Sequence, residues 1–353
     1  MYTLKELEKQ TDDQVVVLKN SQCKANFHAD GRIILDFEST NIIHWFRAIY
    51  HLATSHKIIV DNYYGFLAVT NFKENVLCVQ LWHAAGAIKQ FALTDPSVEF
   101  RSPRAYKRFV DVYHRFNYVV VGSEKMASIF RKSFDLSSEH ILRTGIPRTD
   151  FFFNKQEMKA AEESLREDFP VINKKKVILY APTFRDDQLN VAELELDIKR
   201  MYKSLSRDYV LFLRLHPAIN AEFKNDFPGF IYNVSSYPNI NHLLVITDIL
   251  ISDYSSIPFE FSLLEKPMIF YAYDIDAYHE SRGFWENYEE MVPGPVVKTT
   301  EEIIEVVKQN QFNLQEVSVF ANQWNQYSKG YASERLIQAL YTDEEPLQAV
   351  DQL

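Results

Sequence analysis

Two histidines follow apolar runs that predict buried strands, and they are the first candidates for chemistry. His83 comes after the run Val76 to Leu81, and His216 after the run Val210 to Leu215. Ligands of open parallel sheets bind outside the carboxyl ends of the strands. A neutral imidazole at such a place can take a proton from a hydroxyl group. Two facing sheets could bring both rings to one substrate; the alternative is that each histidine caps a helix or a sheet end.

The second half of the chain gathers further groups that suit an anion. Arg214 precedes His216 by two residues, so both side chains would point to the same side of a strand. Guanidinium groups, hydroxyl groups and free backbone N–H groups at a helix start all bind phosphate. Adjacent serines can instead cap a helix. The set predicts a diphosphate ligand in one crevice and comprises Thr183, Arg185, Arg214, His216, Ser255 and Ser256.

Several enzyme classes are made unlikely by motifs that the sequence lacks. It has neither a GxGxxG nor a GxxxxGK[ST] loop, which argues against nicotinamide dehydrogenases and P-loop enzymes, and it has no GxSxG elbow. Asp186 and Asp187 could hold a metal, but adjacent acids in a loop are more often solvated. The two cysteines, Cys23 and Cys78, have no metal-ligand spacing and indicate a reducing compartment. We therefore expect no metal and no cofactor.

Length and charge limit the class of protein further. A chain of 353 residues with 46% hydrophobic residues is expected to form two well-packed domains. Its formal charge of −10 argues against a nucleic-acid partner. A basic cluster could face an anionic surface or form a solvated helix face, and it comprises Arg101, Arg104, Lys107 and Arg108. No apolar run is long enough to span a bilayer, and the start lacks a signal-peptide core, so we expect a cytosolic protein.

The elements that would position these residues alternate between strands and helices, which is typical of a parallel sheet covered on both faces. Strands are predicted at 33–37, 57–60, 75–83, 118–122, 177–181, 209–215, 249–251 and 267–271. A helix follows residue 41, with an apolar stripe at Ile42, Ile43, Phe46, Ile49 and Leu52. The predicted architecture is α/β with two doubly wound, Rossmann-like domains facing across a cleft. The domains are 1–160 and 161–330, and a terminal helix within 331–353 would be placed to pack back on the first.

Five ordered motifs resemble the CDP-glycerol glycerophosphotransferases of teichoic acid synthesis, the TagB/TagF-like or TarB/TarF-like enzymes. They are Leu81-Trp-His-Ala-Ala-Gly-Ala-Ile-Lys89, Gly145-Ile-Pro-Arg148, Tyr180-Ala-Pro-Thr-Phe-Arg185, Leu213-Arg-Leu-His-Pro217 and Ser252-Asp-Tyr-Ser-Ser-Ile-Pro-Phe-Glu260. The likeness runs from about Ile33 to the C-terminal helices. It implies a GT-B architecture, with a lipid-linked acceptor at the N-terminal domain and CDP-glycerol at the C-terminal domain. It also implies peripheral attachment to the cytoplasmic face of the membrane.

The resemblance also implies roles for residues. His83 is similar in position to the family's catalytic base, and His216 to a second essential histidine near the donor phosphates. The implied donor-binding residues are Arg148, Thr183, Arg185, Arg214, Ser255, Ser256 and Glu260, and the implied acceptor-side residues are Trp82, Gly86 and Lys89. This chain reads Trp82-His-Ala-Ala-Gly86 where many members read Trp-His-Gly-Thr-Pro, and Glu260 stands where an Asp is frequent, so acceptor and donor contacts are expected to differ.

The function that this resemblance implies is transfer of glycerol phosphate from CDP-glycerol, with release of CMP. The expected acceptor is a hydroxyl of the undecaprenyl-diphosphate-linked disaccharide ManNAc-GlcNAc in wall teichoic acid linkage-unit synthesis. The chain's compactness favours such a primase over a poly(glycerol phosphate) polymerase or second-step enzyme, while CDP-ribitol stays open as the donor. A GT-B nucleotide-sugar glycosyltransferase and a non-catalytic nucleotide-binding protein are further alternatives.

Overall fold

Short runs of aliphatic residues form the strands, and all of the strand pairings are parallel. The computed structural model describes residues 1–21, 23, 25, 27, 31–37, 41–183, 185, 194–215 and 225–342. The strands are β1 (Val16–Lys19), β2 (Ile33–Asp36), β3 (Lys57–Val60), β4 (Leu77–Gln80), β5 (Tyr118–Val120), β6 (Ile141–Leu142), β7 (Lys176–Tyr180), β8 (Tyr209–Leu213), β9 (Ile231–Asn233), β10 (Ile249–Ser252), β11 (Met268–Tyr271) and β12 (Val296–Val297).

Most connections between consecutive strands contain α-helix or 3₁₀ helix, as is usual for parallel pairing. The α-helices are α1 (Tyr2–Gln10), α2 (Ile42–Thr54), α3 (Pro103–Tyr113), α4 (Glu124–Phe134), α5 (Lys155–Asp168), α6 (Ile198–Leu205), α7 (Ile240–Ile246), α8 (Ile257–Phe261), α9 (Ile275–Arg282), α10 (Tyr288–Met291), α11 (Thr300–Gln309), α12 (Leu314–Trp324) and α13 (Ala332–Tyr341). Turns of 3₁₀ helix are η1 (Gly65–Val69), η2 (Ala92–Thr94), η3 (Pro96–Phe100), η4 (Ser138–His140), η5 (Pro147–Phe153), η6 (Pro170–Asn173) and η8 (Ser262–Leu264).

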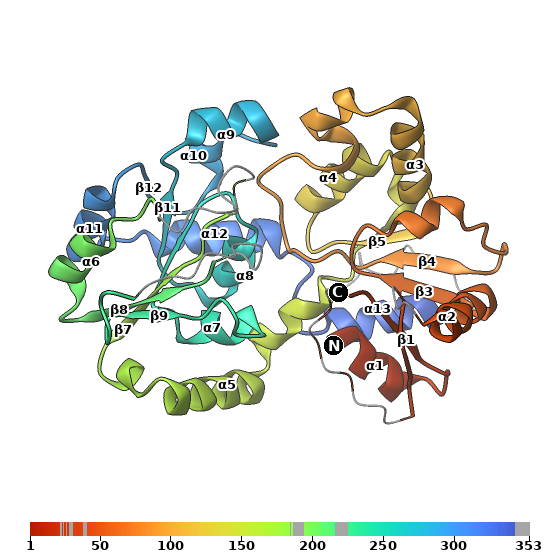
Figure 1. Ribbon diagram of the computed structural model, residues 1–353, viewed down its shortest axis with the longest axis horizontal. Coiled ribbons are helices and arrows are strands. Elements are labelled where there is room, and N and C mark those ends of the chain that lie inside the picture. The colour runs from red at the N-terminus through yellow and green to blue at the C-terminus, as the bar shows by residue number, and fades with distance from the viewer. Residues whose placement is uncertain are drawn as a thin grey trace.

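The elements group into two lobes (Figure 1). We call α1 to η5 together with α13 the N-terminal lobe, and α5 to α12 the C-terminal lobe. The C-terminal lobe has a six-stranded sheet in the order β12-β11-β10-β7-β8-β9. This order reverses between β7 and β10, as in doubly wound nucleotide-binding sheets, where the ligand lies at the reversal point. The loops that follow Tyr180 and Ser252 are therefore the expected ligand loops.

The N-terminal lobe has a four-stranded sheet in the chain order β3-β4-β5-β6, and β1 and β2 form a separate pair. Among its described strands this first sheet shows no reversal of order, so strand order alone does not locate a ligand site in the N-terminal lobe. The register pairs Val60 with Gln80, which brings the ends of β3 and β4 together. Asp61 and the segment leading to His83 consequently leave the sheet side by side.

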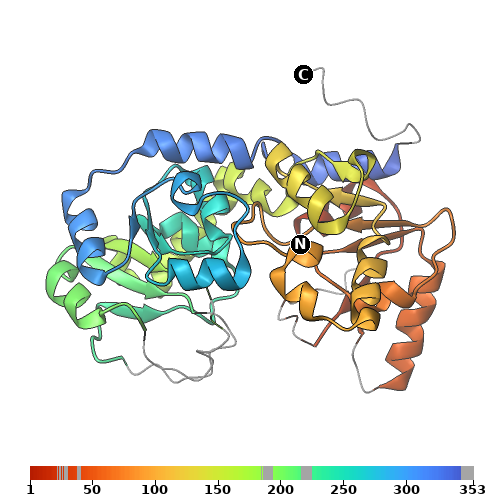
Figure 2. The ribbon, with the colours of Figure 1, turned by 90° about the horizontal axis from the view of Figure 1, so that it is seen from above.

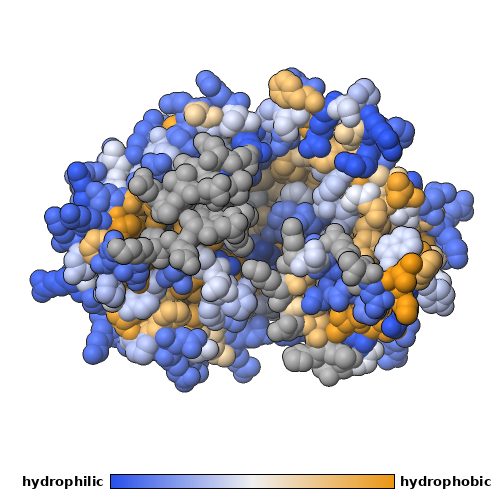
Figure 3. Space-filling model, viewed as in Figure 1, coloured by the Kyte–Doolittle hydropathy of each residue, from blue (hydrophilic) through white to orange (hydrophobic). Residues whose placement is uncertain are grey.

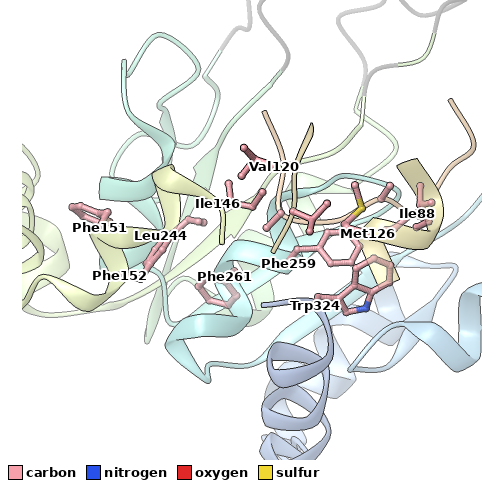
Figure 4. Packing of buried hydrophobic residues seen from close by; sticks show 14 of the residues in the cluster. Ile88, Val120, Met126, Ile146, Phe151, Phe152, Leu244, Phe259, Phe261 and Trp324 are labelled. Atoms are coloured by element: carbon pink, nitrogen blue, oxygen red, sulfur yellow. The ribbon is translucent and has the colours of Figure 1, made fainter. Parts of the chain in front are cut away.

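A continuous apolar core joins the two lobes (Figure 4). Phe259 of α8 packs edge-on against Trp324 of α12, with 4.6 Å between the ring centroids, and both side chains are fully buried. Helix α12 also packs against α4 of the N-terminal lobe. Burial of large aromatic side chains is among the strongest stabilising contributions in a core, so the lobes are held by packing as well as by the chain.

The chain crosses between the lobes twice, at Asn154 and at residues 325–331, and the second crossing packs against the N-terminal lobe and beside Phe153 at the first crossing. Ile146 N–H donates to the Ser328 hydroxyl at 3.2 Å, and Tyr327 N–H donates to the Gly122 carbonyl at 2.8 Å. Gly145 has a φ of +89°, and a Cβ there would lie 2.5 Å from the Tyr327 carbonyl oxygen. Only glycine satisfies both conditions at this position.

The predicted domain limits can be placed on these elements. The limit at residue 160 falls inside α5, which packs on α7 of the C-terminal lobe. After the second crossing, α13 packs on α1 and η5 of the N-terminal lobe. The division into separately folding domains stays a prediction.

The helix predicted after residue 41 is present as α2, and most of its apolar stripe faces away from the protein. Its apolar residues Ile42, Ile43, Phe46 and Ile49 are exposed, and Ala48 is its buried residue. The periodicity correctly indicated an amphipathic helix, but it could not tell which side faces the protein. This helix, α2, packs on β2 through the other side.

Candidate active site

His83 lies where the N-terminal lobe meets the C-terminal lobe, on the segment that leaves β4. Its side chain is exposed, so it is reachable by substrate. The Nδ1 atom lies 3.2 Å from the carbonyl oxygen of Asp61, at the end of the neighbouring strand β3. When Nδ1 carries the proton and donates it to this carbonyl, Nε2 is left as the basic nitrogen. The arrangement therefore suits a general base.

The environment of His83 favours its neutral form. Although solvent reaches the ring, neighbouring protein displaces much of its hydration, and this desolvation lowers the pKa of His83 below its ordinary value of 6.5. The hydrogen bond to Asp61 opposes the lowering of this pKa, and the positive charges of Arg148 and Lys89 add to it. A base must be unprotonated to act, and the lowered pKa keeps the imidazole in its unprotonated form near neutral pH.

Trp82, expected on the acceptor side, fixes the backbone next to His83. Its φ of +59° is in the left-handed region, which costs a residue with a side chain about 1–3 kcal/mol. The side chain of Gln80, itself buried, accepts a hydrogen bond from the Trp82 N–H at 2.8 Å. The indole stacks on the His83 ring and packs against Phe91. The strained turn thus presents the imidazole at a fixed orientation.

Arg148, expected to bind the donor, instead joins His83 to the C-terminal lobe. One guanidinium nitrogen donates to the His83 carbonyl at 2.8 Å, and the other lies 3.0 Å from a carboxylate oxygen of Glu260 and 3.4 Å from the Asn241 side-chain oxygen. Glu260 is buried, and burial raises its pKa while Arg148 opposes the rise. We call Arg148, Glu260 and Asn241 the latch. Arg148 and Glu260 bind each other here, and their donor contacts stay a prediction.

Gly86 and Lys89, also expected on the acceptor side, lie against the C-terminal lobe. A Cβ on Gly86 would come within 2.3 Å of the Phe259 ring of α8. Lys89 pairs in an antiparallel bridge with Phe284, and its Nζ lies 3.4 Å from the Tyr278 hydroxyl. The segment from His83 to Lys89 is thereby held beside α8, the helix that follows Ser255 and Ser256.

The reversal point of the second sheet carries Thr183, Ser255 and Ser256. Thr183 N–H donates to the buried Asp253 carboxylate at 2.8 Å, which ties the loop after β7 to the turn after β10. The Thr183 hydroxyl oxygen is buried and has no hydrogen-bond partner among the residues that the structure describes. Ser255 accepts a hydrogen bond from Ile257 N–H at 3.2 Å, and Ser256 holds the N-cap position of α8 without a side-chain cap. Polar groups thus converge at the place where such sheets bind nucleotides.

Arg185 does not point its guanidinium group at an open phosphate site. It is buried and donates to Asp274 at 2.8 Å and to the Thr183 carbonyl at 2.7 Å, and it lies 3.1 Å from Asp253. Burial alone would lower the pKa of Arg185, but the hydrogen bond to Asp274 and the charge of Asp253 raise it. Two carboxylates, the buried Asp253 and the half-buried Asp274, thus bind the cation within the protein, and a direct contact of Arg185 with the donor stays a prediction. In this structure Arg185 holds the shape of the ligand loop.

Arg214 is likewise engaged with the protein. Its guanidinium donates to the carbonyls of Val234 and Ser235 at 2.8 and 2.9 Å and also to that of Tyr237. Burial lowers the pKa of Arg214. The predicted pairing of Arg214 with His216 cannot be followed further, since His216 lies outside the described residues. Asp186 and Asp187, considered above as metal ligands, lie outside them too.

Sequence reasoning missed Asp61, Asn241, Asp253 and Asp274. Each acts through a contact between segments far apart in the chain, and pairwise contacts of this kind leave no local pattern. Asp61 did carry one signal, because it directly follows the predicted strand 57–60 and thus shares the sheet edge with His83.

Comparison with known proteins agrees with this geometry. The family model of CDP-glycerol:poly(glycerophosphate) glycerophosphotransferases matches residues 5–342. The chain is 39% identical over 301 residues to the teichoic acid glycerol-phosphate primase of Bacillus subtilis (strain 168), covering 85% of this chain and 77% of that protein. It is 35% identical to the teichoic acid poly(ribitol-phosphate) polymerase of Bacillus spizizenii (strain ATCC 23059 / NRRL B-14472 / W23), covering 84% of this chain but 49% of that protein.

Solved structures show the same architecture. The wall teichoic acid polymerase TagF superposes with a TM-score of 0.81 at 27% identity, covering 96% of this chain and 83% of that one. The UDP-GlcNAc 2-epimerase of Neisseria meningitidis, at 16% identity and a TM-score of 0.59, covers 96% of this chain and 94% of that one and shares the fold. The predicted α/β, GT-B-like architecture is confirmed. The family resemblance is confirmed as well: the chain is an enzyme of the CDP-glycerol glycerophosphotransferase family, a group that acts in teichoic acid synthesis.

Proposed function

We propose that this enzyme transfers one glycerol phosphate from CDP-glycerol to a hydroxyl of an undecaprenyl-diphosphate-linked ManNAc-GlcNAc disaccharide and releases CMP. The single observation that carries the proposal is the 39% identity to a glycerol-phosphate primase across 85% of the chain. The exposed imidazole of His83, on a segment whose Gly86 packs against Phe259 of α8, supports the same reading.

In the proposed reaction the acceptor oxygen attacks the β-phosphorus of CDP-glycerol. Nε2 of His83 takes the acceptor's proton, the new P–O bond forms, and the bond from the β-phosphorus to the bridging oxygen breaks. CMP leaves with the electron pair of that bond. Phosphoryl transfer depends chiefly on positioning and on stabilising charge on the phosphoryl oxygens. His216, Thr183, Ser255 and Ser256 are the proposed donor-side groups.

The proposed acceptor is lipid-linked, so the enzyme must work at a membrane surface, and we propose the cytoplasmic face. None of the described helices is both long and apolar enough to cross a bilayer. The basic cluster on and before α3 was one candidate docking face. Within it, Lys107 pairs with Asp111 at 2.8 Å and Arg101 lies over the Phe109 ring, so part of its charge is already engaged.

Mass analysis of the product tests the proposal. The enzyme is incubated with CDP-glycerol and a synthetic disaccharide-lipid, and the acceptor is weighed before and after. We expect an increase of one glycerol phosphate, together with CMP in equal amount. A ladder of additions would indicate a polymerase, a sugar without phosphorus would indicate a glycosyltransferase, and no CMP would indicate a non-catalytic protein.

A second donor deserves the same assay, because relatives include enzymes named for ribitol phosphate. One is the poly(ribitol-phosphate) polymerase reported above, and another is a teichoic acid ribitol-phosphate primase at 31% identity over 84% of this chain. Competition between CDP-glycerol and CDP-ribitol for one acceptor separates the two. We expect CDP-glycerol to be used preferentially, since the glycerol-phosphate primase is 39% identical.

A further inference from the structure

Gln80 is the last residue of β4, and its side-chain amide is buried with both ends bonded. The residue is 1% exposed. Its Nε2 donates to the Asn62 carbonyl at 3.0 Å, and its Oε1 accepts from the Trp82 N–H at 2.8 Å. A carbonyl can only accept and a backbone N–H can only donate, so these partners fix the orientation of the amide. Burying an amide costs free energy unless it is bonded in this way, so both bonds are needed to keep Gln80 inside.

The two bonds lead to the two segments that hold the His83 ring. Asn62 follows Asp61, whose carbonyl oxygen lies 3.2 Å from Nδ1 of His83. Trp82 precedes His83, and its indole stacks on the imidazole with 4.3 Å between the ring centroids. Where these segments leave the sheet, the amide of Gln80 therefore links the strand end that orients the ring to the segment that carries it.

The backbone at Trp82 gives this link a specific task. Its φ of +59° is unfavourable for a residue with a side chain, and such a conformation persists only when neighbouring contacts hold it. The indole is held by packing on Phe91 and Phe130. If φ at Trp82 relaxed, the following peptide would turn and the His83 ring would move. The hydrogen bond from Trp82 N–H to Gln80 opposes that rotation.

The direction of the ring matters because His83 lies where the lobes meet. Figure 2 shows the two lobes side by side, and Figure 3 shows that the surface is hollowed between them. The ring is exposed, and the segment that follows it packs on α8 of the C-terminal lobe through Gly86. Misplacing a reacting group by about 1 Å can cost about a hundredfold in rate. A small rotation at Trp82 would therefore reduce turnover.

We propose that Gln80 is a positioning residue for the reaction. Its amide holds two groups in one fixed geometry, the carbonyl that selects the tautomer of His83 and the peptide that carries the ring. Gln80 acts through His83, because its own side chain is buried in the lobe. The catalytic consequence rests on the proposed role of His83 as the base, whereas the effect on the ring is measurable without any substrate.

The test compares Gln80→Met, which loses both hydrogen bonds, with the control Val79→Ala. Val79 is fully buried in the same strand, and its side chain points to the opposite face of the sheet, so its variant measures the loss of packing alone. Nitrogen-15 NMR of histidine-labelled protein, at a pH above the pKa of His83, reports which ring nitrogen carries the proton, and His83→Gln assigns the signal. We expect the proton on Nδ1 in wild type and in Val79→Ala, and a mixture of both tautomers in Gln80→Met.

The rate should follow the tautomer. We expect the kcat of Gln80→Met to fall about tenfold to a hundredfold with an unchanged KM for CDP-glycerol, because the proposed donor-side turn lies in the other lobe. Val79→Ala should keep the kcat and KM of wild type even if it melts earlier. If Gln80→Met does not fold, Gln80→Asn takes its place, because its amide is one methylene too short to reach both partners.

The outcomes separate positioning from stability. A folded Gln80→Met with the tautomer and kcat of wild type would overturn the proposal. An equal fall of kcat in Gln80→Met and Val79→Ala, with the tautomer unchanged, would also overturn it, since that is the pattern of lost stability. A changed tautomer in Gln80→Met, with no turnover by any of the proteins including wild type, would refute the proposed function and leave the positioning of the ring by Gln80 intact.

Discussion

At the scale of single residues, the proposed chemistry depends on how neighbouring groups determine the orientation, tautomer and protonation of the His83 imidazole. The carbonyl of Asp61 selects the tautomer, Trp82 stacks on the ring, and Arg148 binds the carbonyl of the same residue. None of these groups is a carboxylate partner of the kind found in catalytic triads. The ring is therefore oriented by the backbone, and desolvation, aided by nearby positive charge, lowers its pKa and favours the neutral form.

His83→Gln should abolish most turnover while leaving the fold intact. General base catalysis contributes about 10²- to 10⁴-fold, so we expect a loss of at least about a hundredfold in kcat. The side chain is exposed, so the circular dichroism spectrum and melting temperature should match those of wild type. CMP release from CDP-glycerol is the measurement. Turnover within a few-fold of wild type would show that another group takes the proton.

Arg148→Gln should change the pH dependence of catalysis. The base must be neutral, and its pKa lies below 6.5, so the acid limb of the kcat/KM profile of wild type should lie below that pH. Removing the positive charge of Arg148 makes the imidazolium less unfavourable and raises the pKa of His83. The acid limb should therefore move to higher pH.

Glu260→Gln is the matched control for that prediction. It breaks the ion pair of the latch but keeps the positive charge of Arg148 beside His83. Its acid limb should stay where that of wild type is, even if kcat falls. A shift of the same size in both variants would mean that the latch acts through geometry and not through charge.

At the scale of elements, the terminal helix is capped from a distance. The N-cap residue of α13, Tyr331, makes no side-chain capping bond. Instead the Asp150 carboxylate, on η5, accepts hydrogen bonds from Ala332 N–H at 2.9 Å and Ser333 N–H at 2.8 Å. A carboxylate at a helix N-terminus satisfies free N–H groups and the helix dipole together.

Asp150→Ala should therefore lower the free energy of unfolding by about 1–2 kcal/mol, the cost typical of a lost cap. Asp150→Asn keeps an oxygen that can accept one of the two hydrogen bonds, so its loss should be smaller. Urea denaturation measures both values. Equal stability of Asp150→Ala and wild type would show that solvent replaces the cap at no cost.

The elements also show which parts of the fold could be predicted from the sequence. Buried strands of the second sheet were predictable, because short apolar runs followed by polar turns have few other solutions, and β10 with its Ser255-Ser256 turn came out as expected. The side that α2 shows to solvent was not predictable. An apolar stripe indicates a helix with two unlike sides, but it does not indicate which side packs on the rest of the protein.

The site was predictable in part for a related reason. Positions at strand ends, such as His83 and Thr183, follow from the order of elements alone. Arg148, Arg185 and Arg214 bind acceptors on loops that are distant in the chain. Their spacing in the sequence does not indicate these partners, because the contacts depend on how the loops pack in the folded protein.

At the scale of the whole molecule, Gly86 controls how closely the lobes sit. Gly86→Ala would place a methyl group 2.3 Å from the Phe259 ring, inside van der Waals contact, so the lobes or the ring must shift. Overpacking of this kind costs about 1–3 kcal/mol. We expect a lower melting temperature and a lower kcat, since His83 lies on the displaced segment.

Gly65→Ala is the control, because a Cβ at Gly65 meets nothing within 4 Å. It should melt and turn over like wild type. Calorimetry and initial rates on both variants make the comparison. A Gly86→Ala enzyme with wild-type rate and stability would mean that the two lobes do not need this close approach.

The paired crossings between the lobes restrict how the molecule can open. The second crossing is hydrogen-bonded to the N-terminal lobe through Tyr327 and Ser328, and its Gly330 packs beside Phe153 at the first crossing, so both links bend about one shared axis. Opening must separate Lys89 from Phe284 and the latch from His83, and it must also break the apolar packing of Gly86 on Phe259 and of α4 on α12. CDP-glycerol would then enter, and CMP would leave, at the side of the lobe interface farthest from that axis.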